Sequence, residues 1–220
     1  AKINIHTFHS LCFSILKENF EKAGLSEDFT VMSEQERALC EEEELLNNAL
    51  SFDDLILITV KLLEENPEIL DKYKERFQYV SVDEYQDIDE NQYKLIRLLV
   101  PSNGNIFVIG DPNQAIYGFR GADSEFMFRF SEDYPQAKRI ILNINYRSSG
   151  NIVKNSMKVI GHNEKRFLKE FQSVKENGFC VHVQEVKDPN EEAQYVADEI
   201  EKRAELGISY EEMAVLFRIH

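Results

Sequence analysis

Three short β-rich runs separated by helical stretches constrain the fold of this chain more than any other feature. They are "FQYVSV" at residues 77–82, "NIFVIG" at residues 105–110 and "RIILNI" at residues 139–144. The segment between the first two has a helical pattern that begins at Asp89, with Gln92 as a capping-box partner. A strand, helix, strand order implies a parallel sheet.

The patterns before these runs extend the alternation of strands and helices. Residues 2–6 alternate in the manner of a strand and lead into a helix that is expected to close on Gly24. Residues 33–50 and 52–65 are expected to form two further helices, the second of which stops before Pro67. Together these helices are expected to form a polar, acidic insertion.

A second unit is expected after the third β-rich run. "CVHVQEV" at residues 180–186 and "MAVLF" at residues 213–217 both read as strands. Glu191–Leu206 reads as the helix between them, with Gly207 as its C-cap. The chain is therefore expected to have an α/β fold in two parts, with a boundary near residues 145–150.

Composition excludes several classes of protein. No apolar run approaches the ~20 residues that span a bilayer, and no basic segment followed by an apolar one begins the chain, so neither a membrane nor export is indicated. The cysteines are odd in number and form no CxxC pair, which favours a reducing cytoplasm. The formal charge of −15 argues against a generally basic surface for nucleic acids, so any DNA contact must be local.

Two of the predicted strands end in acid. The first runs into Asp83 and Glu84, and the second runs into Gly110 and Asp111. Ligands of open parallel sheets bind beyond the carboxyl ends of the strands. There, Asp83 can hold Mg²⁺ beside substrate phosphates, while Glu84 orients or deprotonates an attacking water. A bare Asp-Glu pair is more often a solvated, helix-capping loop, so this motif alone decides little.

The segment "VIGDPNQAIYGFRGAD", residues 108–123, favours a functional site. Gln114 can hydrogen-bond a phosphate oxygen or a water, and Arg120 can pair with a carboxylate or a phosphate. An exposed Phe119 offers a face on which a base can stack. The alternative is that Tyr117 and Phe119 are core residues, and the residues themselves leave both interpretations open.

Four segments carry a family resemblance because they occur together in one order. They are "TFHSLC" from Thr7, "VDEYQD" from Val82, "GDPNQAIYGFRGAD" from Gly110 and "NYRS" from Asn145. In this order they resemble the superfamily 1 DNA helicases of the UvrD/Rep/PcrA type, and the resemblance is weakest over residues 20–50. It implies RecA-like domains of the P-loop NTPase type, with a parallel sheet, helices on both faces and a small helical insertion.

The resemblance also implies domain bounds. Residues 1–19 and 52–145 would form part of the first motor domain, residues 20–51 a short accessory insertion, and residues 146–220 the beginning of the second motor domain. The insertion is shorter than the accessory domain usual in the family. Phe119 stands where many members carry Trp, which implies a weaker stacking surface.

On the nucleotide side, the resemblance implies that ATP and Mg²⁺ are bound. Asp83 would hold the metal ion, and Glu84 would activate the hydrolytic water. Gln86 and Asp87 would link this site to neighbouring motifs, and Gln114 would sense the γ-phosphate.

The "NYRS" segment would complete the nucleotide site from the second motor domain. The resemblance implies that Tyr146 stacks on adenine and that Arg147 reaches the γ-phosphate as an arginine finger. By itself, an arginine after a strand is also compatible with an ordinary surface cation.

On the DNA side, the resemblance implies contacts with single-stranded DNA from two segments. They would be made by Thr7, Phe8 and His9 in the first segment and by Tyr117, Phe119 and Arg120 in the second. A histidine at the start of an amphipathic helix, such as His9, is by itself more often a structural residue.

The phosphate-binding loop of such enzymes is missing from this sequence. That loop requires GxxxxGK[ST], and none of the nine glycines here is followed by Lys. The sequence does not begin with Met and ends in a predicted strand, so it reads as a piece of a longer protein. The chain by itself is therefore expected neither to hydrolyse ATP nor to unwind DNA.

Three functions agree with these patterns. The first is part of an ATP-dependent DNA helicase or translocase, of 3′ to 5′ polarity if it follows the family, that acts on single-stranded DNA or a duplex junction in repair or replication. The second is a degenerate helicase-like module that binds a partner protein through acidic helices around Glu41–Glu44. The third is the motor part of a helicase-nuclease.

Overall fold

The computed structural model describes residues 3–39, 48–165, 167 and 170–217. It divides into two compact units, which are described separately. Unit 1 contains Ala1–Leu142 and His162–Lys169, and unit 2 contains Asn143–Gly161 and Glu170–His220. The acidic run at Glu41–Glu44 lies outside the described residues, so the acidic helix expected there stays a prediction.

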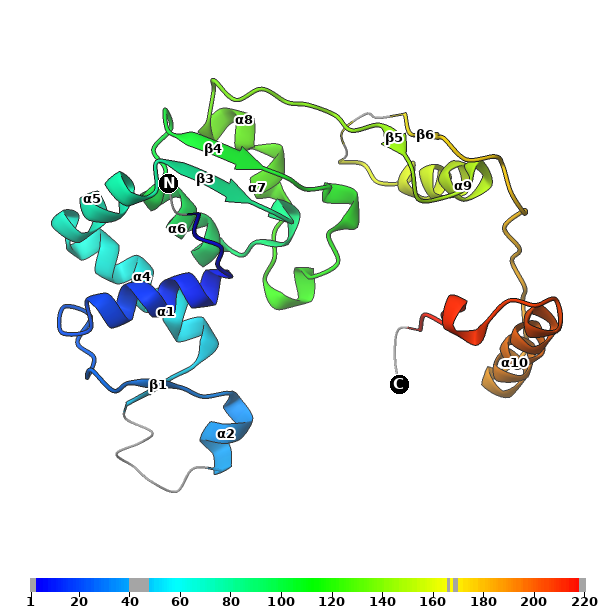
Figure 1. The fold of residues 1–220 in the computed structure, drawn as a ribbon, viewed down its shortest axis with the longest axis horizontal. Helices are drawn as coiled ribbons and strands as arrows, with labels where there is room; N and C mark the ends of the chain where they lie inside the picture. Colours follow the sequence, from blue (N-terminus) through cyan, green and yellow to red (C-terminus); the bar gives the residue numbers. More distant parts are fainter. Residues whose placement is uncertain (1–2, 40–47, 166, 168–169, 218–220) are drawn as a thin grey trace. The chain divides into compact units, whose positions relative to one another are not determined.

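Unit 1 holds most of the regular structure (Figure 1). Its helices are α1 (Phe8–Glu18), α2 (Glu34–Leu39), α4 (Phe52–Glu65), α5 (Pro67–Arg76), α6 (Glu90–Leu99), α7 (Glu125–Phe128) and α8 (Phe130–Asp133). Its strands pair in parallel as β1 (Thr30–Val31) with β2 (Ala49–Leu50) and as β3 (Tyr79–Val82) with β4 (Asn105–Val108). Unit 2 contains the parallel pair β5 (Ile144–Asn145) and β6 (Gln172–Ser173), together with α9 (Gly150–Ile160) and α10 (Pro189–Glu205).

The β3–β4 pair confirms the predicted strand, helix, strand order with a parallel sheet. Val82 is opposite Val108, and α6 lies between the strands in sequence. The even-numbered residues of both strands face the core, whereas Tyr79 and Phe107 are 82% and 58% exposed. These exposed side chains leave helices on both faces of the sheet as a prediction.

The helices α4 and α6 begin and end where local sequence signals place them. Ser51 caps α4 in a reciprocal capping box with Asp54, and α4 ends before Pro67, which opens α5. Asp89 caps α6 by accepting a hydrogen bond from the backbone N–H of Gln92 at 2.9 Å. Each such cap contributes about 1 kcal/mol. The predictions for residues 52–65 and for the start of α6 are confirmed.

The core of unit 1 is built mainly from four helices. α1 and α6 both pack against α4, and α5 closes the group. Its fully or nearly fully buried side chains include Cys12, Ile15, Leu16, Leu55, Leu63, Tyr73 and Leu95. Burial raises the pKa of the Cys12 thiol to about 11, so this cysteine packs as a small apolar residue.

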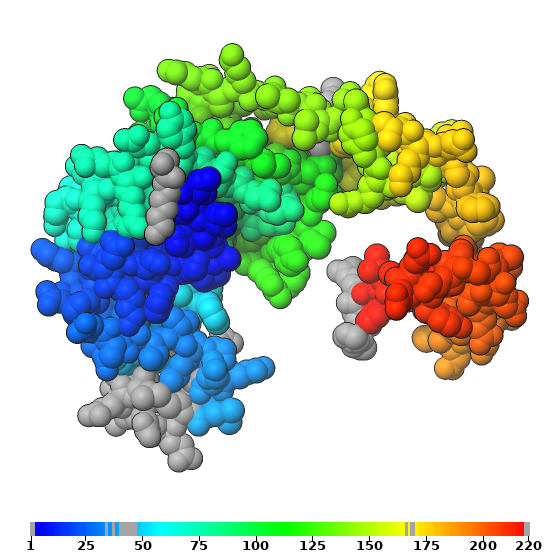
Figure 2. Space-filling view, viewed as in Figure 1, coloured from blue at the N-terminus to red at the C-terminus, as the bar shows by residue number. Residues whose placement is uncertain are grey.

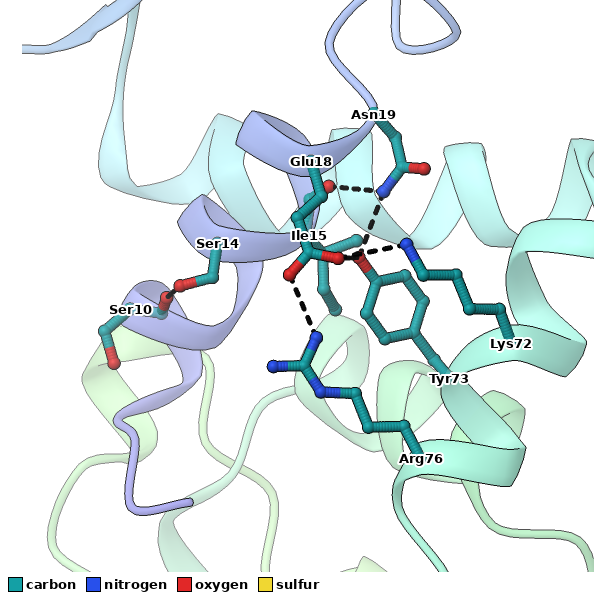
Figure 3. A network of polar contacts seen from close by, with 8 residues as sticks. All are labelled: Ser10, Ser14, Ile15, Glu18, Asn19, Lys72, Tyr73 and Arg76. Carbon is teal, nitrogen blue, oxygen red and sulfur yellow. Dashed lines mark hydrogen bonds and ion pairs between the residues drawn. The ribbon is translucent and has the colours of Figure 1, made fainter. Parts of the chain in front are cut away.

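A polar cluster joins the end of α1 to α5 (Figure 3). The Glu18 carboxylate accepts hydrogen bonds from Lys72 Nζ at 3.1 Å, Tyr73 Oη at 3.0 Å and Arg76 Nη1 at 2.9 Å. Asn19 Nδ2 donates to the same Tyr73 Oη at 3.0 Å. Burial alone would raise the pKa of Glu18, but these donors outweigh it and lower the pKa to about 2. The cluster therefore fixes two helices that lie far apart in sequence.

The first expected helix ends earlier than predicted, and the second is partly replaced by a strand. α1 stops at Glu18 because Asn19 Nδ2 donates to Ile15 O at 2.7 Å, and turns continue from there to Gly24. Ala49 and Leu50, expected to be helical, form β2 instead because their backbones pair with β1.

Four expected strands are not formed over the described parts of their lengths, at residues 3–6, 139–144, 180–186 and 213–217; residue 2 of the first run lies outside the described residues. Only Ile144 of the second run lies in a strand. Ile3, Val183 and Leu216 are 83%, 94% and 95% exposed, and the dark-blue start of the chain lies on the surface in Figure 2. A strand requires a neighbouring backbone for its N–H and C=O groups. Among the described residues of these runs, only Asn143 and Ile144 pair with a neighbouring strand, β6, so the alternation alone was insufficient.

Unit 2 is organised around its helices rather than around the expected second βαβ unit. α10 confirms the helix predicted over Glu191–Leu206, and Gly207 follows it with φ 89°. Asp188 caps α10 by accepting hydrogen bonds from the backbone N–H groups of Asn190 and Glu191. Across both units, none of the described helices combines the length and the apolar character that crossing a membrane requires.

We predict that Glu18→Gln destabilises the chain by about 1 kcal/mol at neutral pH. The variant loses the charge that its three donors bind, and the 38% exposure of Glu18 keeps the effect modest. Because folding lowers the pKa of Glu18 from 4.5 to about 2, the difference should be complete above pH 4.5 and disappear as the pH falls towards 2.

Urea unfolding at a series of pH values measures this difference. Glu21→Gln, which changes an exposed carboxylate just beyond α1, is the matched control and should leave stability unchanged. A Glu18→Gln variant as stable as the wild type at neutral pH would contradict the prediction.

Candidate functional site

Glu84 stands just after β3 in a backbone conformation that L-residues rarely adopt. Its φ and ψ are 51° and 42°, and it alone among the described non-glycine residues has a positive φ. Val82 before it and Tyr85 after it are both buried, and Tyr85 N–H donates to Ile109 O at 2.9 Å. These fixed neighbours hold Glu84 in the left-handed region, at a cost of about 1–2 kcal/mol. Such strain is concentrated at functional sites.

A buried amide joins the ends of β3 and β4. Gln86 is 1% exposed, and its Nε2 donates to Glu84 Oε2 at 2.7 Å and to Asp87 Oδ2 at 3.1 Å. Its Oε1 accepts a hydrogen bond from Asp111 N at 3.0 Å. The side chain thus binds both predicted carboxylates on one strand end and the backbone of the other.

The hydrogen bonds continue from Asp111 to Gln114. Asp111 Oδ1 accepts from Asn113 N at 3.0 Å, and Asp111 Oδ2 accepts from Gln114 Nε2 at 3.3 Å. A continuous path therefore runs from Glu84 through Gln86 and Asp111 to Gln114. The structure thus brings the predicted residues Glu84, Gln86 and Gln114 together, because parallel pairing places both strand ends at the same edge.

The acidic residues suit a metal ion that is shared with a substrate. Asp83 and Glu84 are exposed, and Asp83 Oδ1 accepts from Glu84 N at 3.0 Å. Asp87 Oδ1 is buried with no hydrogen-bond partner among the described residues. Within residues 3–39, 48–165, 167 and 170–217, no group of three or more His, Cys, Asp or Glu could hold a metal ion. Mg²⁺ commonly takes one or two carboxylates plus substrate phosphates, so Asp83 fits that role.

A cluster of aromatic and charged side chains from α6, α7 and α8 packs near the end of β3. The Tyr93 hydroxyl accepts from Arg129 Nη2 at 2.6 Å and donates to Asp133 Oδ2 at 2.9 Å. The Tyr93 ring stacks on Phe126 with 4.3 Å between centroids. The bond to Tyr93 raises the pKa of Arg129, and burial raises that of Tyr85. This packing leaves the residues after β3 little freedom to move inward.

The segment after Gln114 exposes two aromatic rings and a guanidinium group. Phe119 is 79% exposed and Tyr117 is 40% exposed, so the alternative that both are core residues is wrong. The Arg120 guanidinium lies 5.5 Å from the centroid of the Tyr117 ring and 5.4 Å from that of Phe119, within cation–π range. These groups offer planar faces to a base.

Thr7, Phe8 and His9 all have structural contacts at the start of α1. Thr7 caps the helix by accepting from Ser10 N at 3.2 Å. Phe8 is partly buried and packs against both hydrophobic clusters of unit 1. The His9 ring meets the Phe52 ring edge-on, with 5.5 Å between centroids. Thr7 is exposed, whereas Phe8 and His9 are partly buried. Phe52 is itself 53% exposed, so His9 makes its ring contact near the surface and Phe8 packs on the core.

Tyr146 and Arg147 belong to unit 2, where they follow β5. Asn145 Oδ1 accepts hydrogen bonds from Arg147 N at 3.0 Å and from Ser148 N at 2.7 Å, which forms a tight turn. Tyr146 is 70% exposed, and Arg147 is exposed as well. Both side chains are thus accessible to a ligand.

Three residues of the site received no role from the sequence. Asp111 had a visible signal, because it is an acid directly after a predicted strand. Gly110 is needed because a Cβ there would lie 2.5 Å from Gln86 Oε1. Phe52, which supports His9, carries no local signal because the contact depends on how α4 packs on α1.

Comparison with known proteins shows two family matches that lie end to end on the chain. The description "UvrD/REP helicase N-terminal domain" matches residues 38–135, and "UvrD-like helicase C-terminal domain" matches residues 140–220. Proteins named ATP-dependent DNA helicase PcrA are 45% identical over 172 residues in Staphylococcus epidermidis and 43% identical over 172 residues in Staphylococcus aureus. Each alignment covers 78% of this chain and 24% of the relative, so the chain spans about a quarter of the length of the curated relatives it matches.

We predict that Glu84→Gly is more stable than Glu84→Ala by about 1 kcal/mol. Both variants lose the carboxylate and its bond to Gln86, but only glycine adopts a φ of 51° without a Cβ clash. Urea unfolding of the two variants measures the difference. Equal stabilities would show that the left-handed conformation is not maintained in solution.

Proposed function

Because the chain belongs to the UvrD/REP helicase family, we propose that it forms part of an ATP-dependent DNA helicase or translocase. The observation that most directly supports this function is the path of hydrogen bonds from Glu84 to Gln114, which spans the strand ends where a parallel sheet binds its ligand. The PcrA proteins that it resembles carry the name ATP-dependent DNA helicase. We propose this activity for the complete gene product that contains the chain, and no activity for these residues alone, which include no GK[ST] sequence.

We assign nucleotide hydrolysis to the residues after β3 and β4. Asp83 would hold Mg²⁺, which when bound neutralises charge on the phosphates. Glu84 orients the attacking water and accepts its proton. Gln86 ties Glu84 to the end of the neighbouring strand, and Asp87 binds the same Gln86 amide. Gln114 lies on the exposed side of the same network and reaches the γ-phosphate.

We propose that the two units belong to two RecA-like motor domains. The first would include residues 1–19 and 52–145, interrupted by an accessory insertion at residues 20–51, and the second would begin at residue 146. Tyr146 would stack on adenine, and Arg147 would contact the γ-phosphate as an arginine finger. The exposure of both side chains supports these roles.

We propose that single-stranded DNA binds at Tyr117, Phe119 and Arg120. Stacking on exposed rings tolerates any base and needs few cations, which suits a chain with a formal charge of −15. Thr7 and the exposed parts of Phe8 and His9 would contact the same DNA strand. From the family resemblance we also propose that the complete gene product moves from 3′ to 5′ and acts at a duplex junction. It would serve repair or replication in the cytoplasm.

We predict that Glu84→Gln lowers the ATPase rate of the complete gene product about 10²- to 10⁴-fold, because the amide cannot accept the proton of the attacking water. Nucleotide affinity should be retained, since the phosphates are bound by other groups. Steady-state ATPase assays with and without single-stranded DNA, together with titration of a fluorescent ATP analogue, measure both. Glu90→Gln, in the first turn of α6, is the matched control. A Glu84→Gln variant with undiminished turnover would assign the base to another residue.

We predict that Phe119→Ala weakens single-stranded DNA binding by about 1–3 kcal/mol, whereas Phe119→Trp preserves or strengthens it. The ring is 79% exposed, so its removal should leave folding unchanged. Fluorescence anisotropy with a labelled oligonucleotide at fixed salt measures the affinity. Ile116→Ala removes a 69% exposed apolar side chain of the same segment without removing a ring, and serves as the control. Equal losses in both variants would argue against stacking.

A further inference from the structure

We propose that Gln86 is a positioning residue for Glu84, and that it makes hydrolysis depend on contact between the ends of β3 and β4. This inference rests on the proposed function, in which Glu84 activates the water. Its basis is a fully buried amide with three hydrogen bonds, each to a different residue of the site.

The partners of Gln86 allow its amide only one orientation. Both Nε2 hydrogens are used by the carboxylates of Glu84 and Asp87, and Oε1 is used by the backbone N–H of Asp111. If the amide were reversed, its oxygen would face two carboxylate oxygens and its NH₂ would face an N–H donor. Unpaired polar groups in a buried position are costly, so the reversed arrangement is excluded. Gln86 can therefore fix the direction of a partner.

Glu84 needs such a partner because its side chain is exposed. The left-handed backbone sets the direction of its Cβ, but an exposed carboxylate would otherwise sample several rotamers. The 2.7 Å bond from Gln86 Nε2 holds Oε2, and we assign the other oxygen, Oε1, to the water. Because reaction rates depend steeply on such geometry, a loose carboxylate would activate the water poorly.

The position of Gln86 depends in turn on β4. Asp111 N–H, which holds the amide oxygen, directly follows Gly110, and a Cβ on Gly110 would lie 2.5 Å from that same oxygen. It would also lie 3.2 Å from both Met127 Sδ and Tyr85 N, so an added methyl group would be crowded by these two neighbours as well as by the amide. Gly110→Ala is therefore expected to displace Gln86 without altering its chemistry. This provides a second, independent test.

The first test replaces Gln86 with Met in the complete gene product. We expect kcat for ATP hydrolysis in the presence of single-stranded DNA to fall ~10- to 100-fold, with the affinity for a fluorescent ATP analogue unchanged. In a Glu84→Gln background, Gln86→Met should cause no further loss in single-turnover hydrolysis. A purely structural residue would lower the rate by the same factor in both backgrounds. Gln78→Met, at the exposed opposite end of β3, is the matched control.

If the Gln86→Met variant does not fold, two other variants test the same inference. Gln86→Glu keeps an acceptor for Asp111 N–H but turns a carboxylate towards Glu84, and Gly110→Ala displaces the amide. Both should show the same loss of kcat with retained nucleotide affinity.

The outcomes separate this inference from the proposed function. A wild-type gene product without DNA-stimulated ATPase activity would overturn both. Undiminished turnover in Gln86→Met, Gln86→Glu and Gly110→Ala, or losses that multiply with that of Glu84→Gln, would overturn the inference and leave the proposed function standing.

Discussion

The parallel pairing of β3 with β4 is the constraint on which the rest of unit 1 depends. Its hydrogen bonds continue beyond the strands, with Ile109 N donating to Val82 O and Tyr85 N donating to Ile109 O, both at 2.9 Å. This extension fixes the backbone on both sides of Glu84, and so imposes its left-handed conformation. It also brings Asp111 within reach of the Gln86 amide. A shift of register by one residue would reverse the faces of one strand and separate these groups.

Helices could be predicted from the sequence because their signals are local. Asp89 and the apolar spacing after it define α6 within a few residues, as Glu191–Leu206 does for α10. Strands require partners, and the runs at residues 180–186 and 213–217 have none among the described residues. The predictions for β3 and β4 are confirmed because these two strands pair with each other. The sequence had no means of separating these two cases, since each of the four runs reads as a strand by itself and none shows its pairing partner.

The candidate site divides along the same line. Asp83, Glu84 and Gln114 could be selected from residue type and their place after a strand, and Phe119 from its unusual segment. The Gln86 amide joins Glu84 to Asp111 only because of the register between β3 and β4. The spacing of residues in the sequence does not give that register. Phe8 and His9 could be selected from the family resemblance, but their packing could not be predicted. Their segment was read as a DNA contact, which stays a prediction, and the structure adds that Phe8 packs on the core while His9 meets the half-exposed Phe52 ring.

The neutral amide at position 86 also follows from the chemistry required beside it. The carboxylates of Glu84 and Asp87 both accept from one buried side chain, and Lys or Arg is the residue that most strongly binds carboxylates. A cation at hydrogen-bond distance, however, would stabilise the negative charge of Glu84 and make it a poorer proton acceptor. An amide orients the carboxylate without adding charge, and its oxygen binds Asp111 N–H, which no cation can do. For the role that we propose for Glu84, Gln86 thus orients the carboxylate without making it a poorer proton acceptor.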